Sequence, residues 1–222
     1  MLAENRRRKA IADRYAPWRP EEIFLRTQRR RAAARLLVDA GLFPDPGQPA
    51  LEVGYGTLGW FGELLGWGLR ETDLHGLELD AERAQVAQRA LPAADLRVGD
   101  ATALPWKADS FRLVIASTVF SSVLDPTVRE MLAREIERVL APGGGLLFYD
   151  FAVNNPDNDQ VRGVPRREIF RLFPGLRGHA RAVTLAPPLA RRIVPWSWTL
   201  ATCLEAVPIL RTHLLAVLKK AE

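Results

Sequence analysis

Cysteine is almost absent from the sequence. The only cysteine is Cys203, so the chain cannot form an internal disulfide bond. Cys203 and the three histidines do not occur at the spacing of metal ligands, and we therefore expect no metal site. A chain without structural disulfides fits a reducing compartment, and we expect a cytoplasmic protein.

The sequence also lacks a hydrophobic run of membrane-spanning length. Its most apolar stretch, residues 193–204, is too short to cross a bilayer and is interrupted by Pro195. The basic residues 6–9 are not followed by an apolar segment, so we expect no secretory signal. These absences predict a soluble protein with no membrane span.

Neither an internal repeat nor a low-complexity tract is present. Hydrophobic residues make up 48% of the 222 residues and charged residues 26%, which is typical of a globular domain with a full core. We expect one domain over residues 1–222. Its expected parts are an N-terminal helical cap (1–42), a core (48–151), and a substrate-side segment with the last strands (152–222).

The net charge of +5 is unevenly distributed along the chain. Residues 1–35 carry eleven basic and four acidic residues, whereas the remainder carries 20 basic and 22 acidic residues. Such a segment can contact nucleic acid or an anionic membrane, or it can be a solvated helix face whose arginine stems pack on the core. We favour the solvated face and expect no nucleic-acid partner, because aromatic residues do not alternate with the basic run.

Apolar runs typical of strands alternate with helical patterns after residue 50. Strands are expected at 50–54, 74–79, 96–99, 111–117 and 145–151, with helices up to about 68, at 81–90 and at 125–140. This alternation predicts a doubly wound α/β fold with a parallel sheet. Outside it we expect helices at 5–15, 20–41, 165–172 and 188–206 (broken at Pro195), and strands at 176–186 and 211–219.

A glycine-rich loop follows the first expected strand. Gly54, Gly56 and Gly59 allow close approach of a ligand to the backbone and a sharp turn into a helix. Glu78, at the end of the second strand, can accept hydrogen bonds from both hydroxyls of a ribose. This pattern also matches the dinucleotide fingerprint, so an NAD(P)-dependent oxidoreductase is an alternative.

Four further motifs follow in order. Glu52 lies two residues before the first glycine, and the others occupy residues 99–105 (with Gly99, Asp100 and Ala101), 111–114 and 138–144. With these motifs, residues 48–151 resemble the class I S-adenosylmethionine-dependent methyltransferases, in particular the type 11 group. The resemblance implies a Rossmann-like, mostly parallel seven-stranded sheet with an antiparallel last strand and an N-terminal helical lid. Leu58 departs from the pattern, because a glycine is usual there, and this predicts a loop of different shape.

The resemblance implies that residues 48–151 bind S-adenosylmethionine and release S-adenosylhomocysteine. Carboxylates suit its sulfonium and ammonium charges, whereas a dinucleotide pyrophosphate would need arginine, lysine or bare amides. Glu52 would lie near the methionine ammonium group, or would hold the loop that lies near this group. The other implied contacts are Ser117 with the methionine part, Gly54, Tyr55 and Gly56 with methionine and ribose, Glu78 with the ribose hydroxyls, and Leu79, Asp100 and Ala101 with adenine.

Three candidate catalytic residues lie near strand ends. Tyr149 and Asp150 end the fifth strand and His213 begins the last, which in this family is antiparallel. The three are therefore expected at one rim of the sheet, with His213 as general base for a hydroxyl acceptor and Asp150 orienting its imidazole. The alternatives are structural: His213 fixes the last strand, and Asp150 caps a strand end or pairs with an arginine.

We therefore expect methyl transfer to oxygen or another heteroatom of a small, partly apolar molecule. Residues 188–206, which include Trp196 and Trp198, would roof the acceptor pocket. Besides the oxidoreductase, two alternatives stay open: a binding module without turnover, and a methylase of RNA or protein suggested by the basic N-terminus. The sequence does not indicate an oligomeric state.

Overall fold

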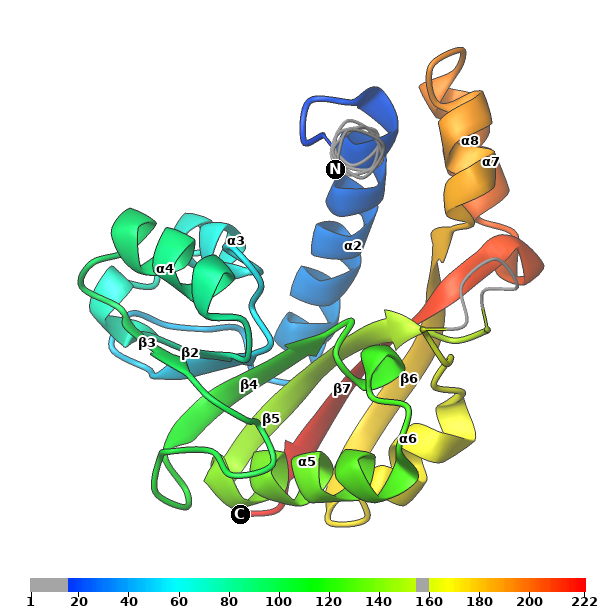
Figure 1. Cartoon of the computed structure of the whole chain (residues 1–222). Helices are drawn as coiled ribbons and strands as arrows, with labels where there is room; N and C mark the ends of the chain where they lie inside the picture. The colour runs from blue at the N-terminus through cyan, green and yellow to red at the C-terminus, as the bar shows by residue number, and fades with distance from the viewer. Residues whose placement is uncertain (1–15, 155–159) are drawn as a thin grey trace. The chain divides into compact units, whose positions relative to one another are not determined.

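The computed structural model describes residues 16–154 and 160–222 (Figure 1). The helix expected at 5–15 lies outside these residues. The described chain divides into two compact units. Unit 1 consists of residues 16–32 and 183–212, and unit 2 consists of the remaining described residues.

Seven strands form a single sheet in the order β3-β2-β1-β4-β5-β7-β6. Strands β1 to β5 pair in parallel, and β7 runs antiparallel to β5. This confirms the expected Rossmann-like α/β fold with an antiparallel last strand. The strands are β1 (Ala50–Val53), β2 (Leu74–Glu78), β3 (Asp95–Val98), β4 (Phe111–Ser117), β5 (Leu140–Phe151), β6 (Leu176–Leu185) and β7 (Arg211–Lys220).

Local sequence signals set the helix ends. Asp80 caps one helix by accepting from the Glu82 and Arg83 N–H groups, and Asp125 caps another whose first residue is Pro126. Pro195 separates two helices, as expected. The helices are α2 (Pro20–Asp39), α3 (Phe61–Gly66), α4 (Ala81–Ala90), α5 (Pro126–Val139), α6 (Arg166–Leu172), α7 (Pro187–Ile193) and α8 (Trp198–Glu205), with 3-10 turns η1 (Glu71–Asp73), η2 (Phe120–Ser122) and η3 (Pro208–Leu210).

The main core of unit 2 lies between the sheet and helices α5 and α6. Leu132 and Ile136 of α5 pack against Leu146 and Phe148 of β5 in one cluster of fully buried side chains. Figure 1 shows both helices along the same face of the sheet. Burial of these apolar faces stabilises the sheet and holds the parallel strands in place.

The strand order reverses between β1 and β4, which is where ligands bind in open α/β sheets. Parallel pairing aligns Val53 of β1 with Ala116 of β4, so both strands end at the same edge. The residues that follow them, Gly54 and Thr118, both have positive φ. The chain therefore turns sharply after both strands, at the point where the strand order reverses.

Unit 1 has a small core of its own. Phe24 of α2 is buried with Ala190 of α7, Ala201 of α8 and Val194, which follows α7. The Phe24 ring meets that of Trp198 edge-on with centroids 5.1 Å apart. The segment 188–206, expected to roof an acceptor pocket, belongs to this unit, and its roofing role stays a prediction. In the described part of the chain, no helix has both the length and the apolarity needed to cross a membrane.

Candidate functional site

The glycine loop after β1 adopts a conformation that L-residues rarely take. Gly54 has a φ of +69°, and a Cβ added there would lie 2.6 Å from Cγ2 of Val119. Val119 lies in the connection between β4 and α5 and was not anticipated from the sequence. Glycine is thus needed at 54 both for its φ and for the close approach of the neighbouring connection.

Glu52 lies buried beneath this loop. Its Oε2 atom accepts a hydrogen bond of 2.7 Å from the Trp60 N–H, and a Cβ on Gly59 would collide with its carboxylate. The glycine that follows Leu58 is therefore the residue that accommodates Glu52, which accounts for the altered motif. The structure shows Glu52 holding the loop, and its contact with a methionine ammonium stays a prediction.

Glu78 connects the end of β2 to the same loop. Its Oε2 atom accepts from the Gly56 N–H at 2.7 Å, and its Oε1 atom accepts from the Asp80 N–H at 3.0 Å. Each carboxylate oxygen can accept a second hydrogen bond. Glu78 can therefore hold the loop and receive a ribose hydroxyl together.

Tyr55 points into the protein rather than along the loop surface. Its ring packs on Phe61 with centroids 5.3 Å apart, over the space that a side chain at Gly76 of β2 would fill. Burial, with the nearby charge of Glu78, raises the pKa of Tyr55 to about 12. Its buried hydroxyl has no hydrogen-bond partner within residues 16–154 and 160–222.

The residues expected at the adenine end share one edge of the sheet. Glu78 pairs with Val98 in parallel register, so Leu79 and Asp100 both lie just beyond the strand ends. Leu79 is 73% exposed, as a surface for a flat ring requires. Asp100 is exposed, and its Oδ1 atom accepts from the Thr102 N–H and hydroxyl at 2.8 and 2.9 Å. Its Oδ2 atom has no hydrogen-bond partner among the described residues.

The remaining expected contacts lie in the same region. Ala101 follows Asp100 in this turn, and Ser117 ends β4 half-buried, in register with Tyr149 of β5. The space above Gly56 is open, since a Cβ built there meets no atom within 4 Å. An open loop and carboxylates held by N–H groups fit a cationic nucleoside such as S-adenosylmethionine.

Comparison with known proteins finds similarity over the part of the chain that contains the glycine loop. A family model described as a methyltransferase domain matches residues 50–144. A demethylmenaquinone methyltransferase of Renibacterium salmoninarum is 34% identical over 142 residues. That match covers 64% of this chain and 56% of the relative, so the chain spans just over half of that protein's length.

Solved structures share the fold at low sequence identity. An S-adenosylmethionine-dependent methyltransferase from Methanosarcina mazei has a TM-score of 0.61 and 17% identity, with 81% of this chain and 95% of that chain covered. Geranyl diphosphate C-methyltransferase from Streptomyces coelicolor, solved with S-adenosylhomocysteine, gives 0.63 and 18%, covering 86% and 76%. Residues 50–144 therefore match a methyltransferase domain, and the chain is similar in fold to class I S-adenosylmethionine-dependent methyltransferases, consistent with the type 11 group.

Two of the three candidate catalytic residues meet at the rim of the sheet. His213 pairs with Phe151 across β5 and β7, and its ring stacks on Tyr149 with centroids 5.0 Å apart. Both rings are largely buried. The topological prediction that the start of the last strand meets the end of the fifth is confirmed.

Asp150 does not join this pair, which corrects the expectation that it orients the His213 imidazole. Successive side chains of a strand point to opposite faces, so Asp150 faces away from Tyr149 and Phe151. Its carboxylate accepts from the Ser121 N–H at 3.0 Å and the Phe151 N–H at 2.8 Å. Burial raises the pKa of the Asp150 carboxyl. Asp150 therefore caps the end of a strand, which was the structural alternative considered for it.

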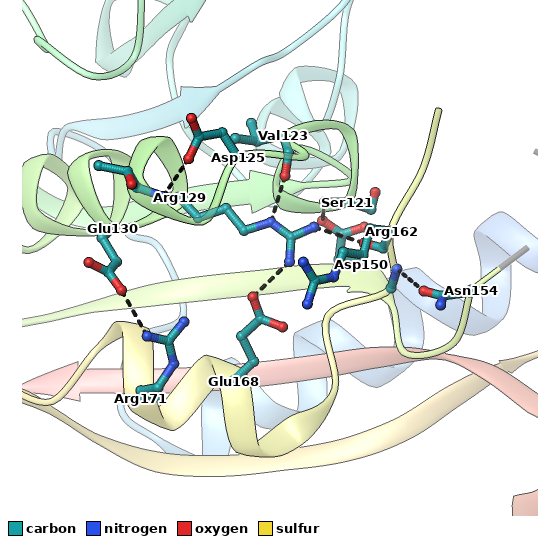
Figure 2. A network of polar contacts seen from close by, with 12 residues as sticks. Ser121, Val123, Asp125, Arg129, Glu130, Asp150, Asn154, Arg162, Glu168 and Arg171 are labelled. Carbon is teal, nitrogen blue, oxygen red and sulfur yellow. Dashed lines mark hydrogen bonds and ion pairs between the residues drawn. The ribbon is translucent and has the colours of Figure 1, made fainter. Parts of the chain in front are cut away.

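A buried arginine that sequence reasoning missed lies near Asp150 (Figure 2). Arg129 of α5 is 1% exposed and donates to the carbonyls of Val123 and Arg162 at 2.6 and 3.0 Å, and to Glu168 at 2.7 Å. It thereby ties α5 to the connection after β4 and to α6. The sequence does indicate that Arg129 is buried, because its spacing places it on the same apolar helix face as Leu132, Ala133 and Ile136.

Proposed function

We propose that this protein transfers the methyl group of S-adenosylmethionine to a small, partly apolar molecule. The observation that carries the proposal is the glycine loop held by Glu52 and Glu78, with Leu79 and Asp100 at the same edge. It lies within residues 50–144, which match the methyltransferase domain. The carboxylate-rich surroundings favour a cationic nucleoside over a pyrophosphate, and so over a nicotinamide cofactor.

Each of the residues around the glycine loop has a proposed role. Glu78 accepts from the ribose hydroxyls, Asp100 accepts from the adenine amino group through Oδ2, and Leu79 packs against the base. Gly54, Tyr55 and Gly56 line the methionine and ribose parts of the nucleoside. When bound, S-adenosylmethionine supplies an electrophilic methyl group, and the chain's part is to align an acceptor with it.

The acceptor side is proposed at the rim formed by Tyr149, Phe151 and His213. Their clustered rings support a partly apolar acceptor. Oxygen or another heteroatom is the proposed acceptor atom, with His213 as the general base for a hydroxyl. Carbon is the second candidate, because a C-methyltransferase is among the proteins that share this fold.

Binding and turnover test the proposal separately. Calorimetry with S-adenosylhomocysteine, S-adenosylmethionine and NAD(P)H should show micromolar binding of the first two only. Release of S-adenosylhomocysteine is then measured across a library of hydroxyl, carboxyl, thiol and activated-carbon acceptors. Binding of NAD(P)H alone would overturn the cofactor assignment. Cofactor binding without turnover on any acceptor class would favour a binding module.

A further inference from the structure

Unit 1 presents large apolar side chains to solvent. Trp18 and Trp196 are 74% and 89% exposed, and Trp198 and Leu200 at the start of α8 are also exposed. We call these four residues the Trp surface. Trp196 occupies the turn between α7 and α8, which Figure 1 shows at the tip of this helix pair. Exposed aromatic groups of this size are typical of contact surfaces.

The segments that carry the Trp surface belong to one packed body. The contact between Phe24 of α2 and Trp198 of α8 joins the beginning of α2, which follows Trp18, to the turn that carries Trp196. Ser197 caps α8 by accepting from the Leu200 N–H at 3.1 Å, which fixes the turn beside Trp196. Trp18 and Trp196 therefore lie in turns that adjoin packed helices, and Trp198 begins a capped helix.

Most charged side chains in the described part of unit 1 are basic. The described residues of unit 1 include eight arginines and three glutamates, and two of these glutamates, Glu21 and Glu22, are buried. Arg192 is exposed in the last turn of α7, just before the turn with Trp196. Residues 183–204 contain two arginines and no acidic residue. The accessible charge of the described part of unit 1 is thus mainly positive.

We propose that the Trp surface of unit 1 docks on an anionic lipid bilayer, with Trp196 in the interfacial region and Arg192 against the headgroups. Tryptophan is enriched at membrane–water interfaces, and basic side chains are attracted to anionic leaflets. An apolar tip bordered by arginines is the arrangement that interfacial helices use. Docking would bring the chain to acceptors dissolved in lipid.

Two other occupants fit less well. A nucleic acid would account for the arginines and for stacking on tryptophan, but not for the exposed aliphatic Leu200 and Ile209. A second copy of the chain would cover the tryptophans, but it would bring like charges such as Arg192 together. A bilayer interface satisfies both the apolar and the positive groups.

Vesicle flotation of the full chain without cofactor tests the proposal, and its outcome is independent of methyl transfer. Vesicles of phosphatidylcholine alone are compared with vesicles that also contain phosphatidylglycerol, at low and high salt. We expect binding to the anionic vesicles to be at least about tenfold tighter than to neutral ones and to weaken at high salt. Equal or absent binding to the two kinds of vesicle would overturn the proposal.

A matched pair of double variants locates the contact. Trp196→Ser/Arg192→Glu should lower the partition coefficient by about tenfold or more. The control Val86→Ser/Arg89→Glu makes the same kind of change on exposed positions of α4 in unit 2 and should stay within about twofold. All four positions are solvent-accessible, so both variants should fold.

Three results would count against the Trp surface. The first is equal vesicle binding by the two double variants, which would place the contact elsewhere. The second is binding of an oligonucleotide that the Trp196 variant loses, without vesicle binding. The third is self-association in sedimentation that this variant abolishes, again without vesicle binding.

Discussion

The imidazole ring of His213 lies nearly parallel to the phenol ring of Tyr149, with centroids 5.0 Å apart and planes inclined by 9°. Phe151, opposite His213 in the ladder, approaches the same imidazole with centroids 4.3 Å apart. Packing against two aromatic rings therefore sets the imidazole plane, while the Asp150 carboxylate lies on the other face of the sheet. A base at this position would be oriented by stacking.

His213→Phe tests this ring, because it preserves a stacked aromatic group and removes both nitrogens. With a hydroxyl acceptor we expect turnover to fall about a hundredfold while the affinity for S-adenosylhomocysteine is unchanged. Release of S-adenosylhomocysteine and calorimetry measure the two quantities. Full turnover in this variant on a hydroxyl acceptor would show that His213 serves only the packing of β7. With an acceptor that is already ionised, the expected effect is small.

Glu78→Ala should weaken cofactor binding by about tenfold or more. The change removes a charged acceptor worth about 1.5–3 kcal/mol and also frees the Gly56 N–H. Glu82→Ala, on the exposed first turn of α4, is the matched control and should bind normally. Calorimetric titration with S-adenosylhomocysteine decides the matter, and normal affinity in Glu78→Ala would remove the ribose assignment.

Asp100→Ala should reduce cofactor affinity without loss of stability. In the described chain the Asp100 side chain bonds only to Thr102, so the fold depends little on it. Loss of one adenine contact predicts a decrease of about fivefold to tenfold in affinity. Calorimetry and thermal unfolding are run together. A normal affinity combined with a large drop in melting temperature would make Asp100 a structural residue.

The two ion pairs in Figure 2 differ in burial and should therefore differ in their contribution to the free energy of unfolding. Arg129→Met leaves Glu168 and two carbonyls without their donor in a buried setting, and should lower the free energy of unfolding by about 3–5 kcal/mol. Arg171→Met removes the exposed pair with Glu130 and should cost no more than about 1 kcal/mol. Urea denaturation compares the two. Equal effects would contradict the buried network.

Asp150 should give the protein a pH-dependent stability. Because burial raises the pKa of its carboxyl in the folded state above the ordinary value of 3.8, the folded chain binds the proton more tightly than the unfolded chain. The contribution of Asp150 to stability is therefore greatest below the ordinary pKa and declines as the pH rises through the raised one. Asp150→Asn should flatten this decline, measured as the free energy of unfolding against pH. Parallel curves for the two proteins would rule out this linkage.

The order and bounds of the strands follow closely from sequence. Strand β4 begins and ends at the expected residues, Phe111 and Ser117, because a continuous apolar run between turn residues defines a central strand. Strand β5 begins at Leu140 rather than 145, since its first residues continue through a glycine-rich turn and pair across a register shift at Phe111. Local patterns thus give the elements but not the irregularities of pairing.

The parts of the site that require a particular residue type at a given position could be predicted from the sequence. The face of the sheet to which a side chain points was predicted less well. Glycine spacing predicted the loop, the end of the second strand predicted Glu78, and the resemblance to a known family implied Asp100. Alternation along β5 would have separated Asp150 from Tyr149, but the expectation followed the rim alone. The partners of Arg129 lie on segments distant in sequence, and so does the contact of Phe24 with Trp198 that builds unit 1. Periodicity within one segment carries no signal for such contacts.

The two carboxylates under the glycine loop also bear on how fast a ligand is taken up. Glu52 and Glu78 fix the loop through the N–H groups of Trp60 and Gly56 when the chain folds. Ordering a backbone residue costs about 1–2 kcal/mol, and here that entropy is lost before a ligand arrives. Association is then not slowed by a search among loop conformers, and affinity differences among nucleoside analogues should reside in their dissociation rates.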